Sequence, residues 1–233
     1  MKSLSLAYFF CYLSILLVFF VGLFFGNYEL IPVKTISSIA LIWIYYENRE
    51  QVSSLYLFII SIIIINDILV LSDFDRYFNI IGILLPLYYI LSSYVLLPYI
   101  SIRNFRYKEV FTPSVFIGMF LILYLTFSIF SLVLNNLRNS IGFAILIIGS
   151  LFYYLASCFV IYIRNQYSHA YYVLIAAICC ILVNAMLPVQ ELYYNNSILD
   201  AVIYSTDVVA MLFYLKFLIA ASYIDKSDTP AFF

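Results

Sequence analysis

The chain has 233 residues, of which 66% are hydrophobic and only 10% charged, whereas soluble globular proteins carry about 25% charged residues. The apolar residues form long unbroken runs, which excludes a soluble domain and the alternating segments of a membrane β-barrel. The formal net charge is −1 and there is no basic tail, so we expect no nucleic-acid partner.

The apolar runs predict an all-α, polytopic integral membrane protein with a single domain over residues 1–233. Eight transmembrane helices are expected, at about residues 4–25, 30–46, 52–72, 77–101, 113–134, 141–163, 170–187 and 201–224. The first run is too long for a signal-peptide core and lacks a small-residue cleavage site, so it counts as a helix. Pro32 is expected in the first turn of the second helix, and Pro188 is expected to end the seventh.

The charges between these helices predict the topology. Eight crossings place both termini on one side, and seven of the nine Lys and Arg residues outside the helices fall on that side. They are Lys2, Arg49, Arg103, Arg106, Lys108, Arg164 and Lys226, against Arg76 and Arg138 on the other side. The positive-inside rule therefore predicts cytoplasmic termini and a multi-pass protein of the cell inner (cytoplasmic) membrane.

Polar residues inside the apolar runs mark a candidate site. Asp67 lies within the third run, where a carboxylate costs roughly 2.5–3.5 kcal/mol at a helix centre. Lys34, Asn66, Asn184 and Asp207 lie at matching depth in the second, third, seventh and eighth helices, about 6–10 Å below the outer surface. We therefore expect one shared polar pocket that opens toward the outer leaflet.

Lys216 is expected to stand apart from this pocket. It follows Asp207 by nine residues and so faces the opposite side of the helix, where its ammonium can extend toward the cytoplasmic surface. Lys34 is the better partner for Asp67 or Asp207. Three structural alternatives stay open: a Lys34–Asp67 pair that only fixes helix order, asparagines that only join helices, and an Asp207 wetted at the outer interface.

The sequence predicts neither a metal nor another cofactor. The four cysteines lie in apolar runs without metal-ligand spacing, which is typical of buried core residues. They are Cys11, Cys158, Cys179 and Cys180.

Four short stretches resemble motifs of one membrane-protein family. They are residues 31–35 (IPVKT), 66–69 (NDIL), 181–185 (ILVNA) and 213–220 (FYLKFLIA). In helix order and in these stretches the chain is similar to the YhhN-like, or lysoplasmalogenase-like, family. It departs from the family pattern at Asn66, which replaces a glycine, and at Asn184, which replaces the aspartate of a Ser-Asp motif. Tyr88 or Tyr89 occupies the stretch in which the family has a histidine.

The resemblance implies a lipid-hydrolysing activity. Active family members cleave the vinyl ether bond of a lysophospholipid and release a fatty aldehyde. It implies Asp67 as the proton donor, Asp207 or Asn184 as the group that positions water, and Lys34 and Asn66 as substrate-binding residues. Lys34 would contact the substrate phosphate or tune Asp67.

Two other classes of function stay open. The missing second acid favours a non-catalytic lipid-binding or structural membrane protein. A transporter is the third alternative, although the sequence has no inverted repeat or pair of broken helices typical of that class. The feature that separates the first two is whether Asp207 faces Asp67. The expected partner is a membrane lipid such as a lysophospholipid, and the sequence predicts no particular oligomeric state.

Overall fold

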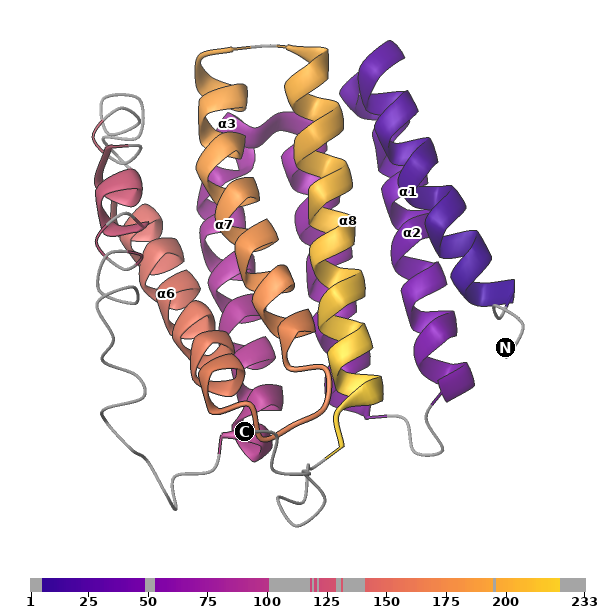
Figure 1. Ribbon diagram of the computed structural model, residues 1–233. Coiled ribbons are helices and arrows are strands. Elements are labelled where there is room, and N and C mark those ends of the chain that lie inside the picture. The colour runs from indigo at the N-terminus through magenta and orange to yellow at the C-terminus, as the bar shows by residue number, and fades with distance from the viewer. Residues whose placement is uncertain are drawn as a thin grey trace.

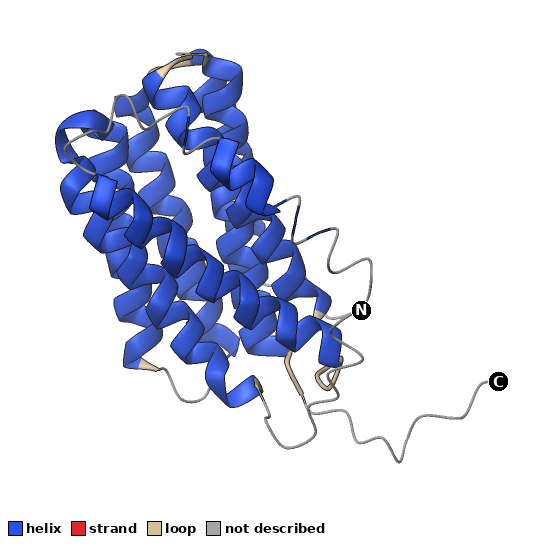
Figure 2. Ribbon diagram, turned by 90° about the vertical axis from the view of Figure 1, so that its left-hand side faces the viewer, coloured by secondary structure: helices blue, strands red, loops and turns tan. Residues whose placement is uncertain are grey.

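The structure, a computed structural model, describes residues 6–48, 53–100, 118, 120, 122–128, 131, 141–194 and 196–222. Every regular element in this part of the chain is helical, as the sequence predicts. The helices lie roughly along one direction and pack into a bundle (Figures 1 and 2).

The first two helices, α1 (Leu6–Phe24) and α2 (Asn27–Asn48), pack against each other. Helix α2 begins three residues before the predicted start, so Pro32 lies in its second turn and the first-turn prediction is wrong. The earlier start is compatible with Glu29, because an acidic side chain in the first turn interacts favourably with the helix dipole.

Helix α3 (Ser54–Leu96) contains a chain reversal at Asp73, the residue with non-helical dihedral angles (φ −170°, ψ 95°). We call residues 54–72 the first arm and residues 74–96 the second arm. The Asp73 carboxylate accepts a hydrogen bond from the Arg76 backbone N–H at 3.0 Å and so caps the second arm. The two helices predicted here are thus joined by a single non-helical residue, and the short 3₁₀ helix η1 (Leu97–Tyr99) follows.

The C-terminal helices are α6 (Ile141–Arg164), α7 (Tyr171–Leu192) and α8 (Ser197–Ala220). Two predicted boundaries are wrong, because α7 continues through Pro188 and α8 begins four residues early. The early start of α8 has a local cause: the Asn196 side chain accepts a hydrogen bond from the Ile198 N–H at 2.9 Å and is a favourable N-cap.

Contacts between helices show at which end of the bundle residues 100 and 141 lie. Near the Asp73 reversal, Gly82 of the second arm packs against Phe143, close to the start of α6. At the opposite end, the Tyr99 ring contacts those of Tyr167 and Phe217. Residues 100 and 141 therefore lie at opposite ends of the bundle (Figure 1).

The predicted fifth helix, residues 113–134, falls mostly outside the described residues. Those of its residues that the structure describes, 118, 120, 122–128 and 131, are helical.

Among the residues that the structure describes, five helices are long and apolar enough to cross a membrane: α1, α3 with η1, α6, α7 and α8. Their outward faces carry large apolar side chains, as on α1, where Leu6, Phe20 and Phe24 are all more than half exposed. A surface of this kind is unfavourable in water and is satisfied by lipid chains. The sequence-based interpretation as a membrane protein agrees with these five helices.

Two clusters of buried apolar side chains fill the bundle. The cluster nearer Asp73 includes Leu30, Val70 and Ile203, and the other includes Leu41, Ile63 and Ala210. On α2, on the first arm of α3 and on α8, one charged residue lies in sequence between a member of each cluster: Lys34 and Asp67, which are buried, and Asp207, which is partly buried. The fold thus brings three ionisable groups to the boundary between the two apolar clusters.

Candidate functional site

Lys34 and Asp67, which are buried, and Asp207, which is partly buried, form a cluster that we call the triad. The Lys34 Nζ lies 2.8 Å from Asp67 Oδ1 and 2.7 Å from Asp207 Oδ2. The side chains come from α2, the first arm of α3 and α8, and that of Lys34 is only 3% exposed. Because both carboxylates contact the same nitrogen, Asp207 faces Asp67, which is the arrangement that the hydrolase hypothesis requires.

The charges of the triad do not cancel. Two ionised carboxylates and one ammonium leave a net charge of −1, and an uncompensated charge in a low-dielectric interior is costly. A proton on either carboxyl group would balance the charge. The triad is therefore a place where a proton has an electrostatic reason to reside.

Tyr204 extends the triad toward the Asp73 end of the bundle. The Lys34 Nζ lies 4.9 Å from the centroid of the Tyr204 ring, within the range of a cation–π interaction. The Tyr204 hydroxyl donates a hydrogen bond of 2.9 Å to Glu191 Oε1. Sequence analysis missed Tyr204, although it lies three residues before Asp207 and so shares a helix face with it.

A small cavity that is lined in part by polar side chains adjoins the triad, and we call it the polar cavity. Its volume is about 30 Å³, and since one water needs at least about 10–15 Å³, it has room for roughly two water molecules. The polar residues that line it are Lys34, Asn66, Asp67, Tyr88, Tyr89, Asn184, Tyr204 and Asp207. All five residues predicted for the site are therefore brought together at one cavity.

The two asparagines have different surroundings. The Asn184 Nδ2 donates to the hydroxyl of Tyr89 and, at 2.8 Å, to the carbonyl of Cys180. Asn66 is 4% exposed, and its Oδ1 has no hydrogen-bond partner among the described residues. A buried acceptor without a donor costs about 1–3 kcal/mol, so Asn66 offers a place for a water or a ligand hydroxyl.

Three residues of the site lie further from the ends of their helices than predicted. Lys34, Asn184 and Asp207 are seven, eight and ten residues from the ends of their helices at the Asp73 end. At 1.5 Å per residue these positions correspond to roughly 10–15 Å, whereas the sequence predicted about 6–10 Å. The difference follows from the helix boundaries, because α2, α7 and α8 each extend further toward that end than expected.

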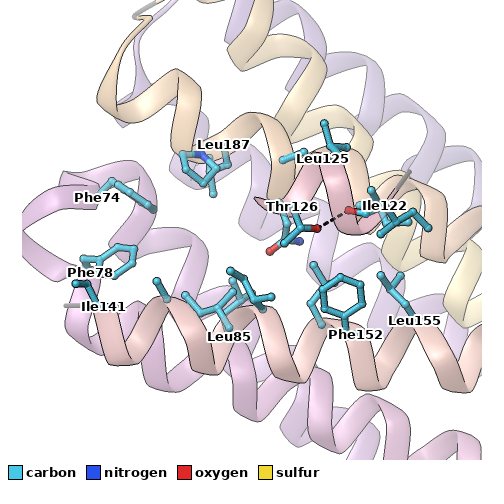
Figure 3. A pocket seen from close by; sticks show the side chains of 18 residues that line it. Phe74, Phe78, Leu85, Ile122, Leu125, Thr126, Ile141, Phe152, Leu155 and Leu187 are labelled. Atoms are coloured by element: carbon cyan, nitrogen blue, oxygen red, sulfur yellow. Dashed lines mark hydrogen bonds between the residues drawn. The ribbon is translucent and has the colours of Figure 1, made fainter. Parts of the chain in front are cut away.

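A second, apolar cavity of about 110 Å³ lies beside the polar one. It is lined by the second arm of α3, by α6 and α7, and by Ile122, Leu125 and Thr126, and Figure 3 shows its lining side chains spread along α6. Leu85, Asn184 and Leu187 line both cavities. Apolar space thus directly adjoins the polar groups of the site.

Lys216 lies outside the site, as predicted. Its Nζ donates a hydrogen bond of 2.8 Å to the Tyr12 hydroxyl and lies 5.2 Å from the centroid of the Phe213 ring. The ammonium therefore has aromatic and hydroxyl partners and makes no contact with the triad.

The cysteines behave as core residues. Cys11, Cys158 and Cys180 are buried, Cys179 is partly buried, and all four are free thiols. Within the described residues no group of three or more His, Cys, Asp or Glu side chains is arranged to hold a metal ion.

Comparisons with protein-family models, with curated proteins and with solved structures find no match for this chain. The functional argument therefore rests on the site itself.

Proposed function

We propose that the protein is a membrane hydrolase that cleaves the vinyl ether bond of a lysophospholipid. The observation that carries the proposal is the meeting of two carboxylates, Asp67 and Asp207, at one buried ammonium beside a polar cavity with room for water. Acid-catalysed hydrolysis of a vinyl ether needs a proton donor, a group that stabilises a developing cation, and a water molecule.

In this proposal Asp67, in its protonated form, donates its proton to the alkene carbon distal to the ether oxygen. The new C–H bond forms as the O–H bond breaks and leaves an oxocarbenium ion. The ionised carboxylate of Asp207 stabilises this cation through a short-range interaction of opposite charges. Because Lys34 already contacts both carboxylates, its proposed role is to hold and tune them rather than to bind the phosphate.

Water then completes the reaction. Its oxygen adds to the cationic carbon while one of its protons passes to a carboxylate. The resulting hemiacetal breaks its bond to the glycerol oxygen, which takes up a proton, and a fatty aldehyde leaves. Asn66 and Asn184 line the cavity and supply amide groups that would hold the water or a hydroxyl of the substrate.

We further propose that the chain crosses the cell inner membrane eight times with both termini in the cytoplasm. The five apolar helices include α3 as one element. Counting its two arms separately and adding α2 and a crossing between residues 100 and 141 gives eight. The opposite positions of residues 100 and 141 support that additional crossing, and the loop charges support the orientation.

Aldehyde release from a lysoplasmalogen by the purified protein in detergent tests the hydrolase. We expect release by the wild type, loss of release in Asp67→Asn, and normal release in Asp75→Asn, which alters an exposed aspartate at the α3 reversal. Release that is equal in all three proteins would contradict the assignment of Asp67. No release by a folded wild type would contradict the hydrolase itself.

One observation favours a second candidate function, a non-catalytic structural or lipid-binding protein. Each charged group of the triad is paired, and the triad links α2, α3 and α8. In this alternative Asp67→Asn would alter the stability of the bundle or its lipid binding, and the wild type would release no aldehyde.

A further inference from the structure

The apolar cavity beside the site combines features that point to one kind of ligand. Among the described residues that line it, only Thr126 and Asn184 have polar side chains. The Thr126 hydroxyl donates to the Ile122 carbonyl, and the Asn184 Nδ2 donates to Tyr89 and Cys180. An ordered water needs two to four polar partners, and apolar cavities of roughly this size hold hydrocarbon in preference to water.

The shape of the cavity restricts the hydrocarbon. Its lining residues on α6 run from Ile141 to Leu155, which corresponds to about 21 Å along the helix. Figure 3 shows the labelled side chains of Phe74, Phe78 and Ile141 toward one end and Phe152 and Leu155 toward the other. A volume of about 110 Å³ that follows a helix for such a length is a narrow space, which admits part of an unbranched chain and not a compact ring system.

The junction between the apolar cavity and the polar cavity indicates that the ligand also has a polar end. Leu85, Asn184 and Leu187 line both cavities, so a molecule in the apolar space has its polar end within reach of the triad. Pairing a hydrocarbon tail with a polar group is the chemistry of a single-chain amphiphile, and a ligand site commonly combines an apolar lining with a few polar groups.

We propose that this cavity is the binding site for the single hydrocarbon chain of an amphiphilic lipid whose polar end reaches Lys34, Asp67 and Asp207. The inference extends the proposed function by assigning the chain-binding site and the residues that select chain length. Ala185 lines the cavity from α7 and Phe152 lines it from α6, so a change in the size of either side chain changes the space for the chain.

The test uses a lipid that cannot be hydrolysed, so that binding is measured independently of catalysis. The probe is a 1-O-alkyl glycerophosphocholine with a saturated ether and a photoreactive diazirine at the chain end, presented to the full-length protein in nanodiscs. We expect cross-links, mapped by mass spectrometry, on Phe152, Leu155 or the other lining residues. Unlabelled hexadecyl lipid should compete for them better than octyl lipid.

Two variants and their matched controls sharpen the test. Ala185→Phe fills the cavity and should weaken binding about tenfold, the loss expected for roughly two methylene groups excluded from apolar surroundings. Leu182→Phe on the same helix changes an outward-facing residue and should bind normally. Phe152→Ala enlarges the cavity and should shift preference toward longer chains, whereas Tyr153→Ala, at an exposed neighbour, should not.

Cross-links confined to outward-facing residues such as Ile145 and Leu146 would overturn the proposal, whether or not the variants fold. So would equal binding by folded Ala185→Phe and Leu182→Phe. Selective chain binding without aldehyde release from a vinyl ether lipid would support the chain site and contradict the hydrolase. Aldehyde release with cross-links only on outward-facing residues would support the hydrolase and contradict the chain site.

Discussion

The ammonium of Lys34 lies 2.7 Å from the carboxylate of Asp207, 173 positions away in the sequence, and so joins α2 to α8. The same ammonium contacts Asp67 on α3. One lysine therefore holds two acids that would otherwise repel each other in a low-dielectric environment. Removing Lys34 should therefore change the stability of the protein differently from removing either aspartate.

Replacement of Lys34 by Met should destabilise the protein strongly. The substitution keeps most of the side-chain volume but leaves two buried carboxylates without their counter-ion, and breaking a buried pair in this way costs about 3–5 kcal/mol. Thermal unfolding of the purified protein in detergent measures the effect.

The pH dependence of Lys34→Met follows from the same charges. Protonation removes the uncompensated carboxylate charges, so the deficit of the variant relative to the wild type should shrink as the pH falls. The triple variant Lys34→Met, Asp67→Asn, Asp207→Asn should recover much of the lost stability at neutral pH. A deficit that is independent of pH and persists in the triple variant would show that the charges are not its cause.

Replacement of either acid alone should have a smaller effect on folding. Asp67→Asn or Asp207→Asn leaves one ammonium and one carboxylate, a neutral pair, so each single variant should unfold within about 1 kcal/mol of the wild type, in the usual range for a single hydrogen bond. Unfolding and aldehyde release measured on the same preparations separate folding from chemistry. Loss of stability as large as that of Lys34→Met would contradict this charge count.

The residues of the site could be predicted from sequence because polar groups in apolar helices are costly and rarely accidental. Asp67 stood out in this way, and Lys34, Asn184 and Asp207 followed from their similar depth. Tyr204 did not, because a tyrosine in an apolar run is equally compatible with a membrane-interface position. Its contact with Lys34 depends on the rotation of α8 against α2, which the sequence pattern does not specify.

The distance of the site residues from their helix ends was harder to predict than which residues form the site. Pro188 was expected to end α7, yet a helix tolerates proline when surrounding packing compensates for the lost backbone hydrogen bond. The start of α8 was misplaced because Asn196 was read as part of a polar loop, although asparagine is a favourable N-cap. Both errors place Asn184 and Asp207 nearer the surface than the structure does.

Substitution of Asn196 tests the cap that sets the start of α8. Asn196→Ala removes the acceptor of the Ile198 N–H and should lower stability by about 0.5–2 kcal/mol. Asn196→Asp retains an acceptor and adds a negative charge at the helix N-terminus, so it should match or exceed the wild type. The two unfolding midpoints provide the comparison, and equal losses in both variants would exclude capping as the reason.

The close approach of α1 and α8 depends on a glycine. A Cβ at Gly22 would lie 2.9 Å from the Cα of Ala201, and this contact involves backbone atoms that cannot rotate away. Small residues allow such approach between membrane helices. Gly22→Ala should therefore push α1 away from α8 and destabilise the protein by about 1–3 kcal/mol.

Gly149 provides the matched control for this substitution, because a Cβ there would meet no atom of the described residues within 4 Å. Alanine is a better helix former than glycine by about 0.8–1.0 kcal/mol, so Gly149→Ala should leave stability unchanged or raise it. Thermal unfolding in the same detergent should thus move the two variants in opposite directions. Because α8 also carries Asp207, displacement of α1 should additionally reduce aldehyde release in Gly22→Ala but not in Gly149→Ala. Equal unfolding midpoints for the two alanine variants would show that α1 and α8 pack less closely than the Gly22–Ala201 contact requires.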